Sequence, residues 1–270
     1  MEIVFFGKGG ATMHSMNYLA IQISYLEHLI SELPDGNFGK YRGKQVLYIY
    51  RMPSDPKVCW SNNRRYCLET KRGNRMCEEV RKSNLLKNKH NMLMDDWKSN
   101  YVGVPPKIQM PYKRQSKMNY EFFDSSLENQ NPNDTESLLE YNNRKFRSKN
   151  EVLAAQILDK MNIEYKVEPR FSTGSKYFYP DFIIGVKELD KSAYVEIYGK
   201  MDDMEYVSAN SKKNGLYFKA GLRQGRDYIP FYSGDAKTFD VEAFEMQIKA
   251  WLELAAEEIV RQAAGEGEKT

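Results

Sequence analysis

The chain has little of what several common classes of protein depend on. Its 270 residues include only 3 cysteines and 3 histidines. Cys59, Cys67 and Cys77 form none of the CxxC pairs that structural zinc sites use, so we expect free thiols. No histidine follows His90, which argues against histidine-dependent catalysis in the second half of the chain. A small, odd number of cysteines also suits a reducing compartment, and we expect a cytoplasmic protein.

Long apolar runs are absent as well. No stretch of the sequence approaches the roughly 18–20 apolar residues that a membrane-spanning helix needs. The first residues do not show a basic segment followed by an apolar one, which is the pattern of a secretory signal. With 29% charged residues, the chain is expected to have no membrane partner.

The net charge of the chain is only +3, but the charge is unevenly distributed. Residues 40–117 contain 19 lysines and arginines against 6 acidic residues, whereas residues 235–270 contain 4 against 9. A basic region on a nearly neutral protein is typical of a polyanionic partner such as nucleic acid. On charge alone, a solvated basic region without a partner would look the same.

Residues 1–140 are expected to form a basic N-terminal region with helices and a small β-sheet. Apolar spacing predicts helices over 12–33 and 78–97 and strands over 45–51 and 65–68. Basic side chains lie among aromatic ones here, a mixture that can bind phosphates and stack on bases. An ordinary small sheet with one solvated face would look similar, and the tyrosines could instead anchor a protein partner. The candidates for nucleic-acid contact are Arg51, Arg64, Arg65, Lys71 and Arg72.

The texture of the sequence changes near residue 140, where we place the domain boundary after a polar stretch over 113–143. Residues 141–264 would form the second domain, and 265–270 a tail. The predicted order of elements is α-β-β-β-α-β-α, a mixed α/β (α+β) arrangement with a sheet flanked by helices. Its helices are predicted over 152–161, 204–219 and 239–261, and its strands over 163–167, 177–184, 194–198 and 227–232.

Two carboxylates lie in the central apolar strands of this second half. Asp181 follows Pro180 at the start of one run, and Glu196 lies in the middle of the next. Because an unpaired buried carboxylate is costly, such groups are usually paired or hold a metal ion. Alternation places Glu196 on the same face as Tyr194 and Tyr198. We expect Asp181 and Glu196 to meet on one face and chelate a divalent metal; the alternative is a turn acid and a solvated strand acid paired with a lysine.

These residues resemble the PD-(D/E)XK nuclease superfamily, which has the restriction-endonuclease-like fold. Pro180-Asp181 matches the first half of its motif, Glu196 the acidic residue of the next strand, and Glu151 an additional acidic residue on the preceding helix. Glu151 also completes a capping box with Ser148, so it has a purely structural explanation. The resemblance covers roughly residues 145–235. The segments SKNE, FYPDF and YVEIYGKMDD look similar to a bacterial group of this superfamily with a basic N-terminal region.

The chain departs from the family pattern at its lysine. The family's lysine normally lies two residues after the second acid, and Tyr198 occupies that position here. Lys200 and Lys213 are the two candidates to replace it. We favour Lys213, on the following helix, because the bacterial group that the chain resembles has its lysine there. If neither lysine reaches the site, the protein would be an inactive relative.

The resemblance implies a metal-assisted mechanism. Asp181, Glu196 and the main-chain carbonyl of Ile197 would hold Mg²⁺, with Mn²⁺ as a possible substitute. Lys213 would orient the nucleophile or stabilise developing charge, and Glu151 would support the metal site. We therefore expect an endonuclease that hydrolyses phosphodiester bonds in double-stranded DNA, of restriction, repair or mobile-element type. The alternative is an inactive nuclease-fold protein that binds nucleic acid or a protein partner.

Overall fold

Residues 15–53, 64–132, 139–174, 176–199, 203–233 and 238–263 are described by a computed structural model. Helices and strands both occur throughout these ranges, so the chain is a mixed α and β protein, as the sequence predicts. Two units can be distinguished, one made by the described residues up to Pro111 and one by Tyr112–Gln262. No helix within the described ranges is long and apolar enough to cross a membrane.

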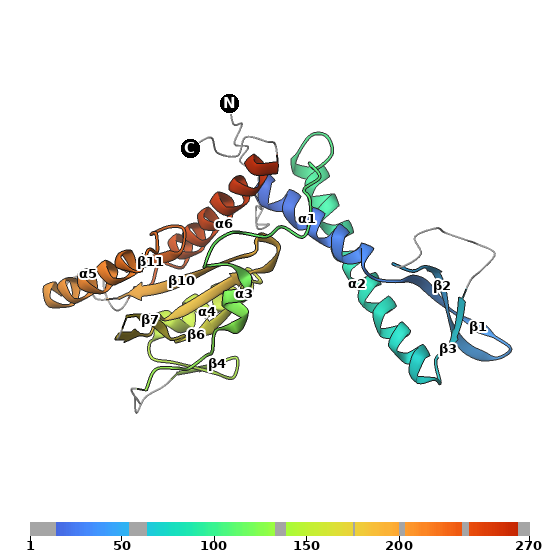
Figure 1. Ribbon diagram of the computed structural model, residues 1–270, viewed down its shortest axis with the longest axis horizontal. Coiled ribbons are helices and arrows are strands. Elements are labelled where there is room, and N and C mark those ends of the chain that lie inside the picture. Colours follow the sequence, from blue (N-terminus) through green and yellow to red (C-terminus); the bar gives the residue numbers. More distant parts are fainter. Residues whose placement is uncertain are drawn as a thin grey trace. The chain divides into compact units, whose positions relative to one another are not determined.

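The first unit contains two long helices that lie side by side, α1 (Met16–Ser31) and α2 (Lys71–Asn100) (Figure 1). Leu19 and Ile23 of α1 pack with Trp97 of α2 in a buried cluster. The helix α2 begins seven residues before the predicted start because Thr70 caps it, its side chain accepting a hydrogen bond from the Gly73 N–H.

A three-stranded antiparallel sheet completes this unit, in the order β1 (Asp35–Tyr41), β2 (Lys44–Arg51) and β3 (Arg64–Cys67). The strand β1 was not predicted, since its sequence contains two glycines and little apolar content. It forms because Arg42 and Gly43 both adopt positive φ angles, as a tight two-residue hairpin turn requires. Leu47 and Ile49 of β2 then pack against α2.

The second unit is built around a four-stranded mixed sheet with the strand order β11-β10-β9-β6. Strands β10 and β11 are parallel, and the other two pairs are antiparallel. The main elements follow the predicted order, with a short β7–β8 hairpin inserted between β6 and β9. They are α4 (Lys149–Lys160), β6 (Glu164–Val167), β7 (Phe171–Thr173), β8 (Lys176–Phe178), β9 (Phe182–Val186), β10 (Lys191–Tyr198), α5 (Met204–Lys219), β11 (Tyr228–Tyr232) and α6 (Val241–Ala263).

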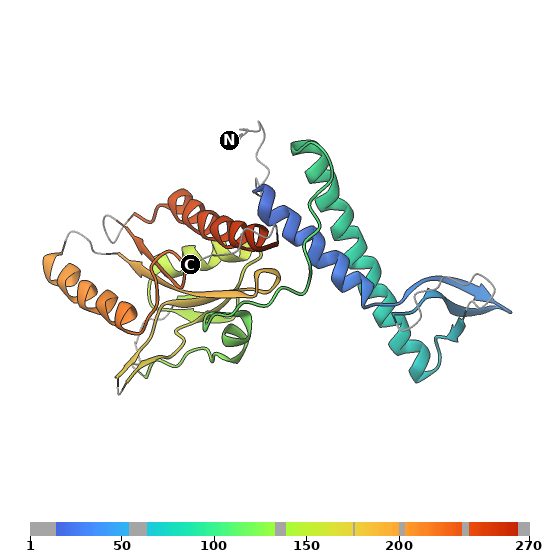
Figure 2. The same cartoon turned by 45° about the horizontal axis from the view of Figure 1, so that its top comes forward.

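Helices cover both faces of this sheet (Figure 2). On one face, Phe244 of α6 packs edge-on against Phe231 of β11. An ion pair between Lys160 and Glu245, with 2.8 Å between Nζ and Oε2, joins α4 to α6. The other face is covered by a small helix, α3 (Tyr120–Ser125), and by α5, whose residues share a buried cluster with Tyr194 of β10. The strand β11, which contains Pro230, lies at the edge of the sheet, as predicted.

The structure divides the chain after Pro111 rather than near residue 140. The segment that follows Pro111 is polar in sequence, but a few apolar side chains attach it to the second unit. Met118 and Phe123 are buried in the same cluster as Tyr194. A further hairpin, β4 (Leu139–Tyr141) and β5 (Arg144–Phe146), lies within the predicted connection. The predicted tail 265–270 lies outside the described residues.

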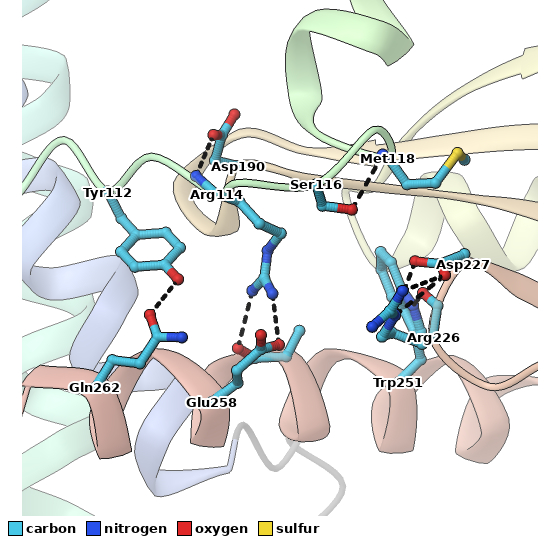
Figure 3. A network of polar contacts seen from close by, with 11 residues as sticks. Tyr112, Arg114, Ser116, Met118, Asp190, Arg226, Asp227, Trp251, Glu258 and Gln262 are labelled. Atoms are coloured by element: carbon cyan, nitrogen blue, oxygen red, sulfur yellow. Dashed lines mark hydrogen bonds and ion pairs between the residues drawn. The ribbon is translucent and has the colours of Figure 1, made fainter. Parts of the chain in front are cut away.

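Polar contacts fix the same segment to α6 and to the turn between β9 and β10 (Figure 3). The main-chain N–H of Arg114 donates to Asp190 at 2.8 Å, and its guanidinium binds Glu258 at 2.5 Å. The hydroxyl of Tyr112 donates to Gln262 at 2.6 Å. Residues 112–118 therefore run along the second unit as part of its structure.

Candidate active site

The two central carboxylates are brought together by the register of β9 and β10. The last residue pair between these strands is Phe182 with Val195. Ile197 lies two residues further along β10, beyond the first residue of β9. Its N–H donates to Oδ2 of Asp181, the residue before β9, at 2.6 Å. Because the N–H and C=O of one strand residue point the same way, the Ile197 carbonyl lies on this same edge of β10.

Glu196 precedes Ile197 in β10, so its side chain points to the opposite face of the sheet, the face covered by α5. Its side chain is only 2% exposed, and its Oε1 receives two donors. The amine of Lys213 lies 2.6 Å from Oε1, and the hydroxyl of Tyr217 donates to the same oxygen at 2.5 Å. Tyr194 and Tyr198 face the same way, since Tyr194 packs near Tyr217 and the Tyr198 hydroxyl donates to Asn214 of α5. The face that alternation predicts for Glu196 is therefore the one covered by α5.

Burial and mutual repulsion control the charges at this site. Burial raises the pKa of Asp181 well above its ordinary value, and the charges of Glu196 and Glu151 raise it further. Burial also raises the pKa of Glu196, although Lys213 and Tyr217 act in the opposite direction. Burial alone would lower the pKa of Lys213, but the charges of Glu196 and Asp181 outweigh it and raise that pKa. The carboxylates thus repel one another, and positive charge placed among them is favoured.

Glu151 is close enough to raise the pKa of Asp181, but its carboxylate is engaged in capping α4. Oε1 accepts a hydrogen bond from the Ser148 hydroxyl at 2.8 Å, and Oε2 accepts one from the Arg147 N–H at 3.0 Å. Ser148 in turn accepts from the Glu151 N–H at 3.2 Å. Ser148 thus caps the helix as the capping box predicts, whereas the Glu151 carboxylate accepts from the N–H of Arg147 instead of that of Ser148. Glu151 therefore contributes charge near the site, and both of its oxygens accept hydrogen bonds.

The oxygens available at the site fit a hard divalent cation. Within the described ranges, no hydrogen bond reaches Asp181 Oδ1 or Glu196 Oε2. Carboxylate and main-chain carbonyl oxygens suit Mg²⁺, which takes few protein ligands and keeps several waters. In the part of the chain that the structure describes, no three His, Cys, Asp or Glu side chains are grouped to hold a metal ion. The fit is therefore that of a site with two carboxylates.

The predicted nucleic-acid contacts lie in the first unit and divide into two kinds. Arg51 has a structural role, because its guanidinium donates to the carbonyls of Ile30, Ser31 and Leu33 at the end of α1, at 3.0–3.1 Å. A phosphate contact of Arg51 stays a prediction. The others leave charge at the surface or beside aromatic rings. Arg65 lies 4.1 Å above the Tyr41 ring, Arg72 lies 5.5 Å above the Tyr66 ring, and Lys71 is exposed.

Two candidates fall where the structure says nothing of their side chains. Lys200 lies outside the described residues, and Arg64 is described only as part of the backbone of β3. Of the two candidate lysines, Lys213 is the one that the structure describes, and its amine lies at Glu196.

Tyr217 is not among the site residues predicted from the sequence, although its hydroxyl contacts Glu196 directly. Its signal was its spacing of four residues from Lys213, which puts both side chains on one face of a helix. A buried tyrosine at helical spacing is more often part of a core, and Tyr217 is also that, being 1% exposed.

No protein-family model matches the chain, and searches of curated proteins and of solved structures find no match either. The nuclease resemblance therefore depends on the residues and geometry of this chain alone.

Proposed function

We propose that the second unit is a Mg²⁺-dependent nuclease of the PD-(D/E)XK type that hydrolyses phosphodiester bonds in double-stranded DNA. The observation that carries this proposal is the placement of the Lys213 amine 2.6 Å from Glu196, with Asp181 bound to the next residue of the same strand. The lysine comes from α5 rather than from β10, yet its amine contacts Glu196 and its charge interacts with that of Asp181. The element order and the mixed four-stranded sheet also agree with the fold that the resemblance implies.

Each residue would have a distinct part in the reaction. Asp181, Glu196 and the Ile197 carbonyl would hold Mg²⁺ or Mn²⁺, which when bound supplies positive charge at the scissile phosphate. Lys213, kept protonated by its raised pKa, would donate a hydrogen bond that orients the nucleophile or stabilises the developing negative charge. Glu151, held by the helix cap, would add negative charge that favours cation binding.

The first unit would contribute to DNA binding. Arg65 and Arg72 each lie over an aromatic ring, and Lys71 is exposed at the start of α2. Guanidinium groups held against rings keep donors for phosphate oxygens, and long-range attraction to DNA depends on the summed positive charge. We propose these three residues as non-specific backbone contacts.

A second candidate function is favoured by one observation. Tyr198 occupies the family's usual lysine position, and its hydroxyl is bound to Asn214 and Tyr228, at 2.7 Å in each case. Tyr198 is thus committed to a hydrogen-bond network and cannot replace a lysine. If Lys213 does not serve in its place, the protein would bind nucleic acid without cleaving it.

A plasmid cleavage assay with Mg²⁺ tests the proposal. Asp181→Asn, Glu196→Gln and Lys213→Met are each expected to lower the cleavage rate by about 100-fold or more. Lys212→Met is the matched control, because Lys212 is the exposed neighbour of Lys213 and should leave the rate unchanged. Undiminished cleavage by both carboxylate variants would exclude this site. Salt-dependent DNA binding by a wild-type protein that does not cleave would establish the second candidate.

A further inference from the structure

We propose that Tyr217 is a positioning residue that fixes the Glu196 carboxylate so that Oε2 is presented to a divalent cation. This inference rests on the proposed nuclease function and deepens it. It starts from the two donors on Glu196, which come from adjacent turns of α5 and bind the same oxygen, Oε1. Among the described residues, Oε2 has no hydrogen bond, so it is the oxygen left for a cation.

The two donors on Oε1 differ in rigidity. The terminal torsion of a glutamate is broad, so a carboxylate turns easily unless its partners hold it. Lysine carries its amine on a flexible four-carbon chain, whereas the tyrosine hydroxyl is fixed by only two torsions. The Tyr217 hydroxyl is therefore the donor that can define the plane of the Glu196 carboxylate.

The ring of Tyr217 is itself held on both sides. It stacks on Tyr228 of β11 with ring centroids 4.3 Å apart and on Phe171 of β7 with centroids 5.0 Å apart. Tyr194 packs beside it at 6.3 Å. Turning the ring would displace residues on three strands, so its hydroxyl is preorganised before any ligand binds.

This division of work releases Lys213 for chemistry. If Lys213 alone held Glu196, its amine would lose the contact with the carboxylate whenever it moved to contact a reacting phosphate. With Tyr217 on Oε1, the carboxylate keeps its orientation when the Lys213 amine moves toward substrate. The hairpin that contains Phe171 also leads along the chain to Asp181, so the segments that carry both acids pack around one aromatic stack.

Tyr228 provides a matched control. It is as buried as Tyr217, and its ring belongs to the same stack. Its hydroxyl contacts Tyr198 and Asn214 instead of Glu196. Tyr228→Phe therefore removes a hydroxyl from the same cluster without removing a donor to the carboxylate.

The experiment measures Mn²⁺ affinity by calorimetry on the full chain, without DNA. Tyr217→Phe is expected to weaken Mn²⁺ binding by about 10- to 100-fold, the usual effect of removing a partner that orients a metal ligand. Tyr228→Phe should bind Mn²⁺ as the wild type does, and Glu196→Gln should lose the binding. Circular dichroism of the two phenylalanine variants compares their folding.

Lys213→Met gives a second measurement that does not depend on how Tyr217→Phe folds. If Tyr217 positions the carboxylate, Lys213→Met keeps or gains Mn²⁺ affinity, because it removes only a positive charge and a flexible donor. Loss of Mn²⁺ binding in Lys213→Met would overturn the inference. Wild-type affinity in Tyr217→Phe, or an equal loss in Tyr228→Phe, would also overturn it while the proposed function stands. A wild-type protein that binds no Mn²⁺ would overturn both.

Discussion

Lys191 is a buried lysine whose cost to the fold can be calculated. It begins β10, is 3% exposed, and has its amine 5.5 Å from the centre of the Trp251 ring. The pKa of Lys191 is lowered from 10.5 to about 8, chiefly by burial and also by the charge of Arg114, whereas Glu258 and Asp227 act in the opposite direction. Figure 3 shows Arg114, Glu258, Asp227 and Trp251, together with Asp190, which precedes Lys191 in the sequence.

The change in pKa gives the size of the effect. A drop from 10.5 in the unfolded chain to about 8 in the folded one corresponds to about 3 kcal/mol. Because the folded value is the lower one, this cost is fully present below pH 8, where both states are protonated. Between pH 8 and 10.5 the unfolded chain holds a proton that the folded chain has lost, so the unfolding free energy rises with pH.

Lys191→Met is therefore expected to stabilise the protein by about 3 kcal/mol at pH 7, and by only about 1 kcal/mol at pH 9.5. Urea unfolding followed by circular dichroism at several pH values measures this difference. Taking the difference between variant and wild type cancels the titration of other groups. Lys219→Met, at an exposed lysine of the same unit, is the control and should change the unfolding free energy little. A constant gap between pH 7 and 9.5, or a less stable Lys191→Met, would refute the reasoning.

Two further predictions concern the frame of each unit. Arg51→Ala removes three hydrogen bonds to the end of α1 and should lower the unfolding free energy by about 2–4 kcal/mol. Its DNA affinity should be unchanged in an anisotropy titration. Weaker DNA binding at unchanged stability would instead show that Arg51 contacts DNA. Gly185→Ala would place a Cβ 2.4 Å from the Phe123 ring and should cost about 1–3 kcal/mol, whereas Gly215→Ala in α5 meets nothing within 4 Å and should stabilise by about 0.5–1 kcal/mol. Equal urea midpoints for the two alanine variants would contradict the packing of α3 on β9.

Local rules were enough to predict several features of the second unit. The alternation along β10 placed Glu196 with Tyr194 and Tyr198, the capping box placed Glu151, and Pro230 indicated an edge strand. Each depends on residues close together in the sequence. Strand alternation, the N-cap of a helix and the missing N–H of proline all act on the neighbouring residues of the chain.

Features that depend on distant partners were missed. The strand β1 is formed through its pairing with β2, and its own residues do not favour a strand. Residues 112–125 join the second unit through a few anchors, such as Met118 and Phe123, set among polar neighbours. The basic character of Arg51 suggested phosphate, but its guanidinium donates three hydrogen bonds to carbonyls at the end of α1. Composition cannot show which partner a donor finds.

The register between β9 and β10 also determines which residues come together at the candidate site. A slip of one residue would turn Glu196 to the face covered by α6 and would bring a different main-chain N–H to Asp181. The alignment of Phe182 with Val195, which the core requires, is thus the same alignment that brings the two acids together. An insertion or deletion in the turn Lys187–Leu189 leaves the site intact only if Phe182 stays paired with Val195. A change in length that shifts this pairing removes the site even where the sheet still forms.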